Sequence, residues 1–464
     1  MTNTIGPAAL APSIYALDVV SSTELQGIVS GLAAGTDYNV VVYNSGAAPS
    51  ATSAATMVAV SDNTSTTGGT GALNVVPENG VRVIDTRSGL GMPVGALTPG
   101  AVYTVAESTL FYNTPAVPTN IPTNATGVIF NVTAVAPSGA GNLQLWEAGT
   151  CVANDDVRST VNFQPPQDTN NSNIVVLGPG ENLCVQDNGA SVNMVVDVTG
   201  YIVGDYVPRD PGLVDPTTRI LDSRPGAPAD QNLIQGPLAG GTVYRLPVPV
   251  QTNATAYVLN VTAVGPTAAG NLRVFPEPSS GPPAPSAVPD TAVDTYIPGV
   301  DGGSMFVTML GDINTTTNTG YIDLYSDSSG TVNVVIDEIG HFTAGSSVTA
   351  ISPTRMIDTR PGGVAAGGMT NFTAAPFAAI PQDVPSGALG VFGDLADIQP
   401  TSPGYLVAYP AGDPMPATAS IANFPGQTRS TTAFAAVNPA NGMVSVSSVG
   451  ASTNFTFDAT GYIS

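Results

Sequence analysis

Short stretches in which apolar and polar residues alternate recur along the chain. The clearest lie near the ends of repeated segments, with apolar positions Val192, Met194, Val196 and Val198 in one and Phe455 and Phe457 in another. A period of two is typical of a β-strand with one buried face. No comparable window shows a helical period with caps, and 41 Pro and 51 Gly would interrupt most helices. The pattern predicts an all-β protein of β-sandwiches, with the jelly roll as an alternative arrangement.

The first 60 residues form a unit of their own. The stretch from Val29 to Val40 contains Leu32, a Gly35-Thr36 turn and Tyr38, and it resembles the later strands of a fibronectin type III module. We therefore expect a small Ig-like β-module at 1–60. A flexible Ser/Thr/Gly-rich linker at 61–73 follows. The candidate strands of this module are 14–20, 24–30, 37–43 and 56–61.

One motif then opens three successive segments at nearly equal intervals. It reads Arg-x-x-Asp-x-Arg, and its charged residues are Arg82, Asp85 and Arg87, then Arg219, Asp222 and Arg224, then Arg355, Asp358 and Arg360. A second motif, Asn-x-x-x-Asp-x-x-Gly-aromatic, closes the segments with Asp197, Asp337 and Asp458. Self-similarity of this kind indicates tandem domains of one fold. We expect repeats at 74–206, 213–344 and 350–464, with short linkers at 210–217 and 345–351.

Further shared marks lie between these two motifs. Asn131 and Asn260 each begin an Asn-Val-Thr-Ala-Val segment, and Asn162 and Asn423 each precede Phe. With the Asp-Thr-Arg opening and the Asp-x-x-Gly-Tyr close, the pattern resembles a β-domain found in tandem in surface and wall-associated proteins of actinobacteria and in proteins of their phages. The resemblance covers residues from about 75 to 464. It implies extracellular display rather than a defined activity.

Charge narrows the choice of partners. The formal net charge is −23, and all 11 basic residues are Arg. Phosphate binding needs a basic face, so we expect no nucleic-acid partner. Anionic membranes are disfavoured for the same reason, and no apolar run reaches the ~20 residues of a membrane helix. Acidity instead suits a soluble, repetitive surface.

The chain carries few marks of its compartment. Its N-terminus lacks a basic segment, and Pro7 and Pro12 interrupt the apolar stretch, so it is a poor secretory signal. The composition is nevertheless typical of extracellular proteins. Either this sequence lacks its signal, or the protein leaves the cell in a virus particle. Cys151 and Cys184 both lie in the first repeat, where a disulfide and two buried thiols fit equally well.

The common catalytic routes lack their residues. The one histidine, His341, stands where the sister repeats carry Tyr201 and Tyr462, so we interpret it as a packed aromatic substitute. Without Lys there is neither a phosphate-loop lysine nor a Schiff base. Two Cys and one His do not complete a zinc site, and nothing singles out a carboxylate pair for glycoside hydrolysis. We expect a protein that is not an enzyme.

We likewise expect no cofactor. The acidic turns 301–303 and 326–330 offer oxygen ligands for Ca²⁺, but neither has EF-hand spacing, so we interpret them as solvated turns.

The opening motif holds six of the 11 arginines. It could form a ligand site, because arginine binds carboxylates and sugar acids bidentately. We favour a structural clamp, in which these arginines pair with the motif aspartates and the closing aspartates and join the first and last strands.

Three functions remain after these exclusions. The first is a structural protein of a virion surface, in a phage of an actinobacterium, whose residues 1–60 dock on other virion proteins and whose repeats form a capsid decoration, tail fibre or spike that attaches to the host surface. Tandem repeats also suit a homo-oligomer or another symmetric assembly. The second is a secreted or wall-associated adhesin that binds glycans with gains from avidity. The third, a polysaccharide hydrolase, ranks last.

Overall fold

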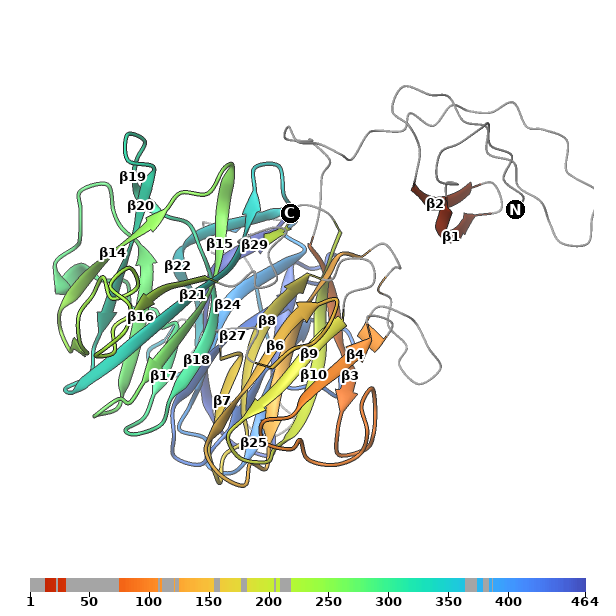
Figure 1. Ribbon diagram of the computed structural model, residues 1–464, viewed down its shortest axis with the longest axis horizontal. Coiled ribbons are helices and arrows are strands. Elements are labelled where there is room, and N and C mark those ends of the chain that lie inside the picture. Colours follow the sequence, from red (N-terminus) through yellow and green to blue (C-terminus); the bar gives the residue numbers. More distant parts are fainter. Residues whose placement is uncertain are drawn as a thin grey trace, which may run out of the picture. The chain divides into compact units, whose positions relative to one another are not determined.

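The computed structural model describes residues 13–21, 24–30, 75–106, 109–110, 121, 125–153, 159–176, 182–203, 206–208, 218–363, 374–378, 384–385 and 387–464. The protein is all-β, as predicted, and its sheets are antiparallel (Figure 1). In the N-terminal unit β1 (Ser13–Ser21) pairs with β2 (Glu24–Ser30), at the first two predicted strands. The strands predicted at 37–43 and 56–61 and the linkers predicted at 61–73 and 210–217 lie outside the described residues.

Repeat 1 is a sandwich of two four-stranded sheets. The inner sheet has the order β3-β10-β5-β8, and the outer sheet has the order β4-β9-β6-β7. Their bounds are β3 (Val75–Asp85), β4 (Val102–Ala106), β5 (Gly127–Val135), β6 (Gly141–Ala148), β7 (Val161–Phe163), β8 (Thr169–Val176), β9 (Asn182–Asn188) and β10 (Asn193–Ile202).

Repeat 2 follows the same plan. In its inner sheet β21 lies between β15 and the short strands β11, β12 and β13, with β18 beyond β15, and its outer sheet has the order β14-β20-β16-β17 with β19 beside β20. Its strands are β11 (Tyr206–Pro208), β12 (Thr218–Asp222), β13 (Leu238–Ala239), β14 (Val243–Pro249), β15 (Ala254–Val264), β16 (Gly270–Pro276), β17 (Asp294–Tyr296), β18 (Gly302–Thr308), β19 (Gly311–Asn314), β20 (Thr319–Ser326) and β21 (Thr331–Thr343), with a 3₁₀ turn η1 (Pro285–Ala287).

Repeat 3 has the sheets β22-β29-β24-β27 and β23-β28-β25-β26. Its first strand begins earlier than expected, because Val348 already pairs with Ile463, so the segment predicted as a linker at 345–351 is partly strand. The bounds are β22 (Val348–Asp358), β23 (Ala374–Ala378), β24 (Gly390–Ile398), β25 (Gly404–Pro410), β26 (Ile421–Asn423), β27 (Arg429–Ala436), β28 (Met443–Val449) and β29 (Asn454–Ile463).

The three inner sheets share one apolar core. All three repeats belong to one compact unit, and the equivalent strands β8, β18 and β27 contact one another pairwise (Figure 1). The repeats are therefore grouped around a pseudo-threefold axis. Strand register assigns the shared core to three equivalent sets: Ile129, Val258 and Phe392; Ile174, Val307 and Phe434; Ile202, Phe342 and Ile463.

This shared core corrects the expectation of one buried face per strand. In β10 the predicted apolar face is buried, but Val195 and Asp197 on the other face are buried as well. In β29 Thr456 and Asp458 are buried as well as Phe455 and Phe457 on the other face. The inner sheets pack on their own outer sheet on one side and on the neighbouring repeats on the other, so their closing strands meet little solvent on either face.

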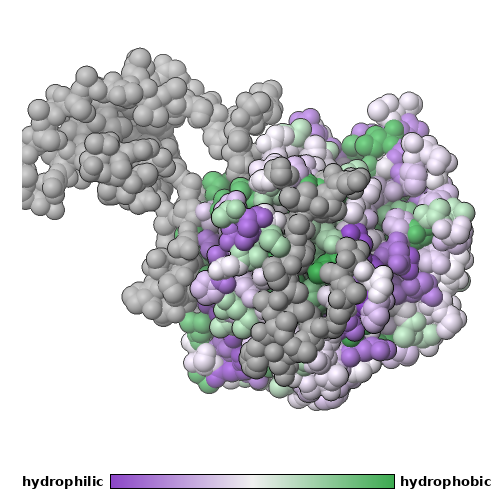
Figure 2. Space-filling view, turned by 180° about the vertical axis from the view of Figure 1, so that it is seen from behind, coloured by the Kyte–Doolittle hydropathy of each residue, from purple (hydrophilic) through white to green (hydrophobic). Residues whose placement is uncertain are grey.

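The outer surface is mixed in polarity. Figure 2 shows small green patches scattered among white and purple residues. The large apolar side chains that are exposed in the described part of the chain stand apart in sequence: Val94, Val152, Leu233, Ile313, Leu389 and Met415. In the described residues, no helix has the length and apolar character to span a membrane.

Candidate functional site

The two arginines of each opening motif have different partners, and only the first of them holds the closing strand. Arg82 donates from Nε and Nη2 to the two carboxylate oxygens of Asp197, at 2.8 and 3.1 Å, across the paired strands β3 and β10. Arg87 instead folds onto Asp85, with Nε and Nη2 at 2.9 and 2.7 Å from its oxygens. The other repeats form the matching pairs Arg219–Asp337, Arg224–Asp222, Arg355–Asp458 and Arg360–Asp358.

In the clamp of repeat 1, the pKa values of the two aspartates shift in opposite directions. Burial raises the pKa of Asp197, against the opposing hydrogen bond and charge of Arg82. The hydrogen bond from Arg87 is the largest influence on Asp85 and lowers its pKa. Removing Arg82 would leave the charge of Asp197 buried without its cation.

The clamp of one repeat also receives a loop of another. The N–H of Ala419, just before β26 in repeat 3, donates to Oδ2 of Asp197 at 3.4 Å, and its carbonyl accepts from Nδ2 of Asn131 at 2.8 Å. Both acceptor and donor belong to repeat 1. The clamp therefore serves the contact between repeats as well as the closure of one sandwich.

Equivalent contacts continue around the ring. The loop before β17 in repeat 2 reaches the clamp of repeat 3, where the Asp290 carbonyl accepts from Arg355 Nη2 at 2.6 Å and the Ala292 N–H donates to Asp458. The loop before β7 in repeat 1 reaches repeat 2, where the Ser159 carbonyl accepts from Asn260 Nδ2 at 3.1 Å. Each repeat thus offers a loop to one neighbour and receives a loop from the other, at its clamp or at the asparagine paired with the clamp aspartate. This is a head-to-tail interface that closes after three copies.

A buried polar layer joins the strands nearest the axis. Asn171 in β8 donates from Nδ2 to Asn260 Oδ1 of repeat 2 at 3.1 Å. Its Oδ1 accepts from the Met305 N–H of repeat 2 at 2.9 Å and from Thr431 Oγ1 of repeat 3 at 3.3 Å. One side chain therefore bridges all three repeats, in a place where unsatisfied groups would be costly.

Two residues beside this layer break the repeat symmetry. Strand register makes Asp294 of β17 equivalent to Val161 of β7 and Ile421 of β26, which are apolar. Register also makes Arg429 of β27 equivalent to Thr169 and Gly302, the first residues of β8 and β18. One repeat thus supplies an acid and another a base where the sister copies are uncharged.

Arg429 stands out among the described arginines, because no carboxylate lies within ion-pair distance of it. Among the arginines that the structure describes, it alone forms no ion pair within 4.0 Å; those that form one are Arg82, Arg87, Arg219, Arg224, Arg245, Arg273, Arg355 and Arg360. Asp294 is 2% exposed, and its Oδ2 is buried without a hydrogen bond. Burial raises the pKa of Asp294 to about 7, and the charge of Arg429 offsets this only in part.

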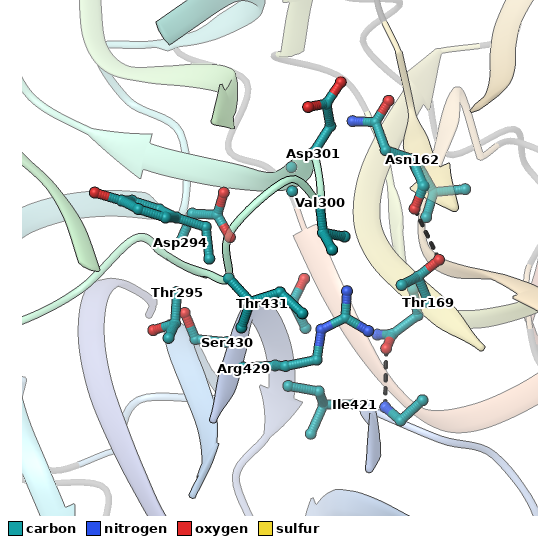
Figure 3. Close-up of a pocket in the computed structure, with 17 residues that line it drawn as sticks. Asn162, Thr169, Asp294, Thr295, Val300, Asp301, Ile421, Arg429, Ser430 and Thr431 are labelled. Atoms are coloured by element: carbon teal, nitrogen blue, oxygen red, sulfur yellow. Dashed lines mark hydrogen bonds between the residues drawn. The ribbon is translucent and has the colours of Figure 1, made fainter. Parts of the chain in front are cut away.

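Arg429 lies in a small pocket lined by all three repeats. Figure 3 shows its guanidinium in the middle of the pocket, with Asp294 on one side and Asn162 and Thr169 on the other. The Asn162 side-chain nitrogen is buried and has no hydrogen-bond acceptor. Gly302 keeps the space open, since a Cβ there would lie 2.7 Å from Asp294 Oδ2. The pocket thus presents two unused donors, one of them charged.

Sequence reasoning placed the clamp residues but missed this pocket. The signal that could have found it is the departure of Asp294 and Arg429 from their sister repeats. That comparison needs strand register, because repeats 2 and 3 diverge in sequence around β17 and β27.

The two cysteines and the histidine lie in packed surroundings. Cys151 and Cys184 form a disulfide, which decides between the two alternatives left open by the sequence, and Cys184 packs beside the buried Trp146. His341 is buried, with its ring centroid 6.2 Å from that of Tyr257.

The acidic turns at 301–303 and 326–330 use their carboxylates to accept hydrogen bonds from the backbone. Asp301 accepts from the Gly265 N–H at 2.7 Å, and Asp327 accepts from the Asn271 N–H at 2.7 Å. Within the described ranges, no cluster of three or more His, Cys, Asp or Glu side chains is arranged to hold a metal ion.

No protein-family model matches the sequence, and no curated protein matches it significantly.

Proposed function

We propose that this chain is a non-enzymatic structural protein of a phage virion surface, a capsid decoration or spike in which residues 1–60 dock on other virion proteins and the three repeats are displayed. The observation that carries the proposal is the closed ring of repeats. Three head-to-tail contacts and one shared core give a single chain the symmetry that a homotrimer would otherwise supply.

The ring of three repeats, which we call the head, suits attachment at a threefold position of a larger assembly. A single chain would fill such a position and present a similar surface to each of the three surrounding subunits. The outer surface, on which the apolar patches are small and scattered, and the net charge of −23 favour display in water. A pseudosymmetric head also leaves one N-terminal unit per three displayed domains, which suits a single tether.

Electron microscopy of the native source, labelled with an antibody against residues 75–464, tests the proposal. We expect regular labelling of virus particles. A binding experiment on particles stripped of the protein sharpens it: the full chain should rebind, whereas residues 72–464 should not. Labelling of cell envelopes or secreted material instead would reject the virion proposal and favour the glycan-binding adhesin.

A further inference from the structure

The pocket around Arg429, which lies on the pseudo-threefold axis between the three repeats, has the chemistry of an anion site. Two donors face it and come from different repeats: the guanidinium of Arg429, which is partly buried, and the side-chain amide of Asn162, which is buried without an acceptor. Arg429 is partly buried and has no ion pair within 4.0 Å, so a bound anion would neutralise a charge that the surrounding side chains leave unpaired.

The size of the pocket limits what it can hold. Its volume is about 30 Å³, on a scale where one water needs roughly 10–15 Å³, so it admits a group of a few heavy atoms. A single arginine pairs well with one carboxylate, whose two oxygens match the guanidinium fork. A dianion such as phosphate is disfavoured, because Asp294 lines the same pocket and Asp301 stands at its edge.

We infer that the pocket on the pseudo-threefold axis binds a small carboxylate, with Arg429 as its charged anchor and Asn162 as a second donor. The carboxylate belongs either to a free small acid or to an acidic side chain of a partner protein. This inference is independent of the proposed virion role, since it rests only on residues that line the pocket between the three repeats.

The competing interpretation is a purely structural one, in which water bridges Arg429 to Asp294. The two differ in what Asp294 does. As the counterion of Arg429 it would be needed for stability, whereas beside a bound carboxylate it repels the ligand. Asp294→Asn removes the charge but keeps the size of the side chain. It also keeps an oxygen that can accept the hydrogen bond from the Ala263 N–H, so the variant separates the two cases.

Calorimetric titration of the full chain with sodium acetate, against sodium chloride at equal ionic strength, tests the inference. We expect saturable acetate binding that falls at least tenfold in Arg429→Gln and tightens several-fold in Asp294→Asn. Arg245→Gln is the matched control, because that arginine pairs with Glu277 on an outer sheet and should leave acetate binding unchanged.

A second measurement covers the case in which Arg429→Gln fails to fold. Crystals of the wild-type chain soaked in bromoacetate should show an anomalous bromine peak in the pocket. Displacement of acetate by N-acetyl-aspartyl-amide would identify an acidic side chain as the source, and its failure to compete would identify a free acid. No saturable acetate binding and no bromine peak, or equal binding in Arg429→Gln, would overturn the inference.

Discussion

The side-chain amide of Asn131, in repeat 1, donates a 2.8 Å hydrogen bond to the carbonyl of Ala419, in repeat 3. Asn260 makes the same contact with Ser159 at the next interface. Strand register places Asp394 at the third equivalent position, opposite Asp458. Asp394 is buried, and burial raises its pKa well above the ordinary value. One of the three interfaces therefore carries a carboxylic acid where the others carry an amide.

Replacing this acid by the amide of its sister repeats should stabilise the protein. We expect Asp394→Asn to add about 1–3 kcal/mol at pH 8, since it removes a buried group that must ionise or hold its proton at a cost. At pH 5 the gain should be smaller, because the raised pKa of Asp394 favours its protonated form in the folded state as the pH falls. Melting temperatures at the two pH values measure the effect, with Asn260→Asp as a control expected to melt lower at pH 8. A lower melting temperature for Asp394→Asn at pH 8 would contradict the prediction.

Mild acid should stabilise the folded chain. Burial raises the pKa of Asp294, Asp323 and Asp397 to about 7 and that of Asp187 to about 6. The folded state binds these protons more tightly than the unfolded state, so the stabilisation is complete below the ordinary aspartate pKa of about 4 and is lost as pH rises through 6 and 7.

Calorimetry across this pH range checks the sign. We expect the melting temperature to fall between about pH 5 and pH 8. Added salt screens surface repulsion, so the fall that persists in salt belongs to the buried groups. Asp397→Asn should reduce it. A melting temperature that rises toward pH 8 in salt would refute the assignment.

The two arginines of a clamp should differ in their contribution to stability. Arg355→Met leaves Asp458 buried without its cation and should cost about 3–5 kcal/mol. The side chain of Arg360 is 47% exposed, and Arg360→Met should cost about 0–1 kcal/mol. Denaturant unfolding of both variants beside the wild type gives the difference. Equal losses would show that the partner of the closing aspartate has no special role.

Loss of the disulfide should loosen the outer sheet of repeat 1. Cys151 and Cys184 are 33 residues apart, and chain entropy for a loop of that length gives about 3–4 kcal/mol. Trp146, the one tryptophan, packs against Cys184. We expect its emission to shift to the red at a lower temperature in the Cys151→Ala/Cys184→Ala variant. An unchanged transition would mean that packing alone holds this sheet.

An isolated repeat should not stay monomeric. Residues 213–344 alone would expose Val258, Val307 and Phe342, which are buried in the shared core. Size-exclusion chromatography with light scattering should find self-association, reduced by Val258→Thr with Val307→Thr. A monomeric fragment with a cooperative melt would show that the repeats fold independently.

The sequence by itself determined the all-β class, the first two N-terminal strands and the three copies of one unit. These follow from local alternation and from motifs that return in order along the chain. Only the tertiary structure decided that the repeats close into a ring, that both faces of the closing strands are buried, and that Asp294 and Arg429 share a pocket. The reason is physical: alternation reports one buried face, whereas contacts such as that of Asn171 with Thr431 join residues 260 positions apart, and their pairing depends on how whole sheets pack.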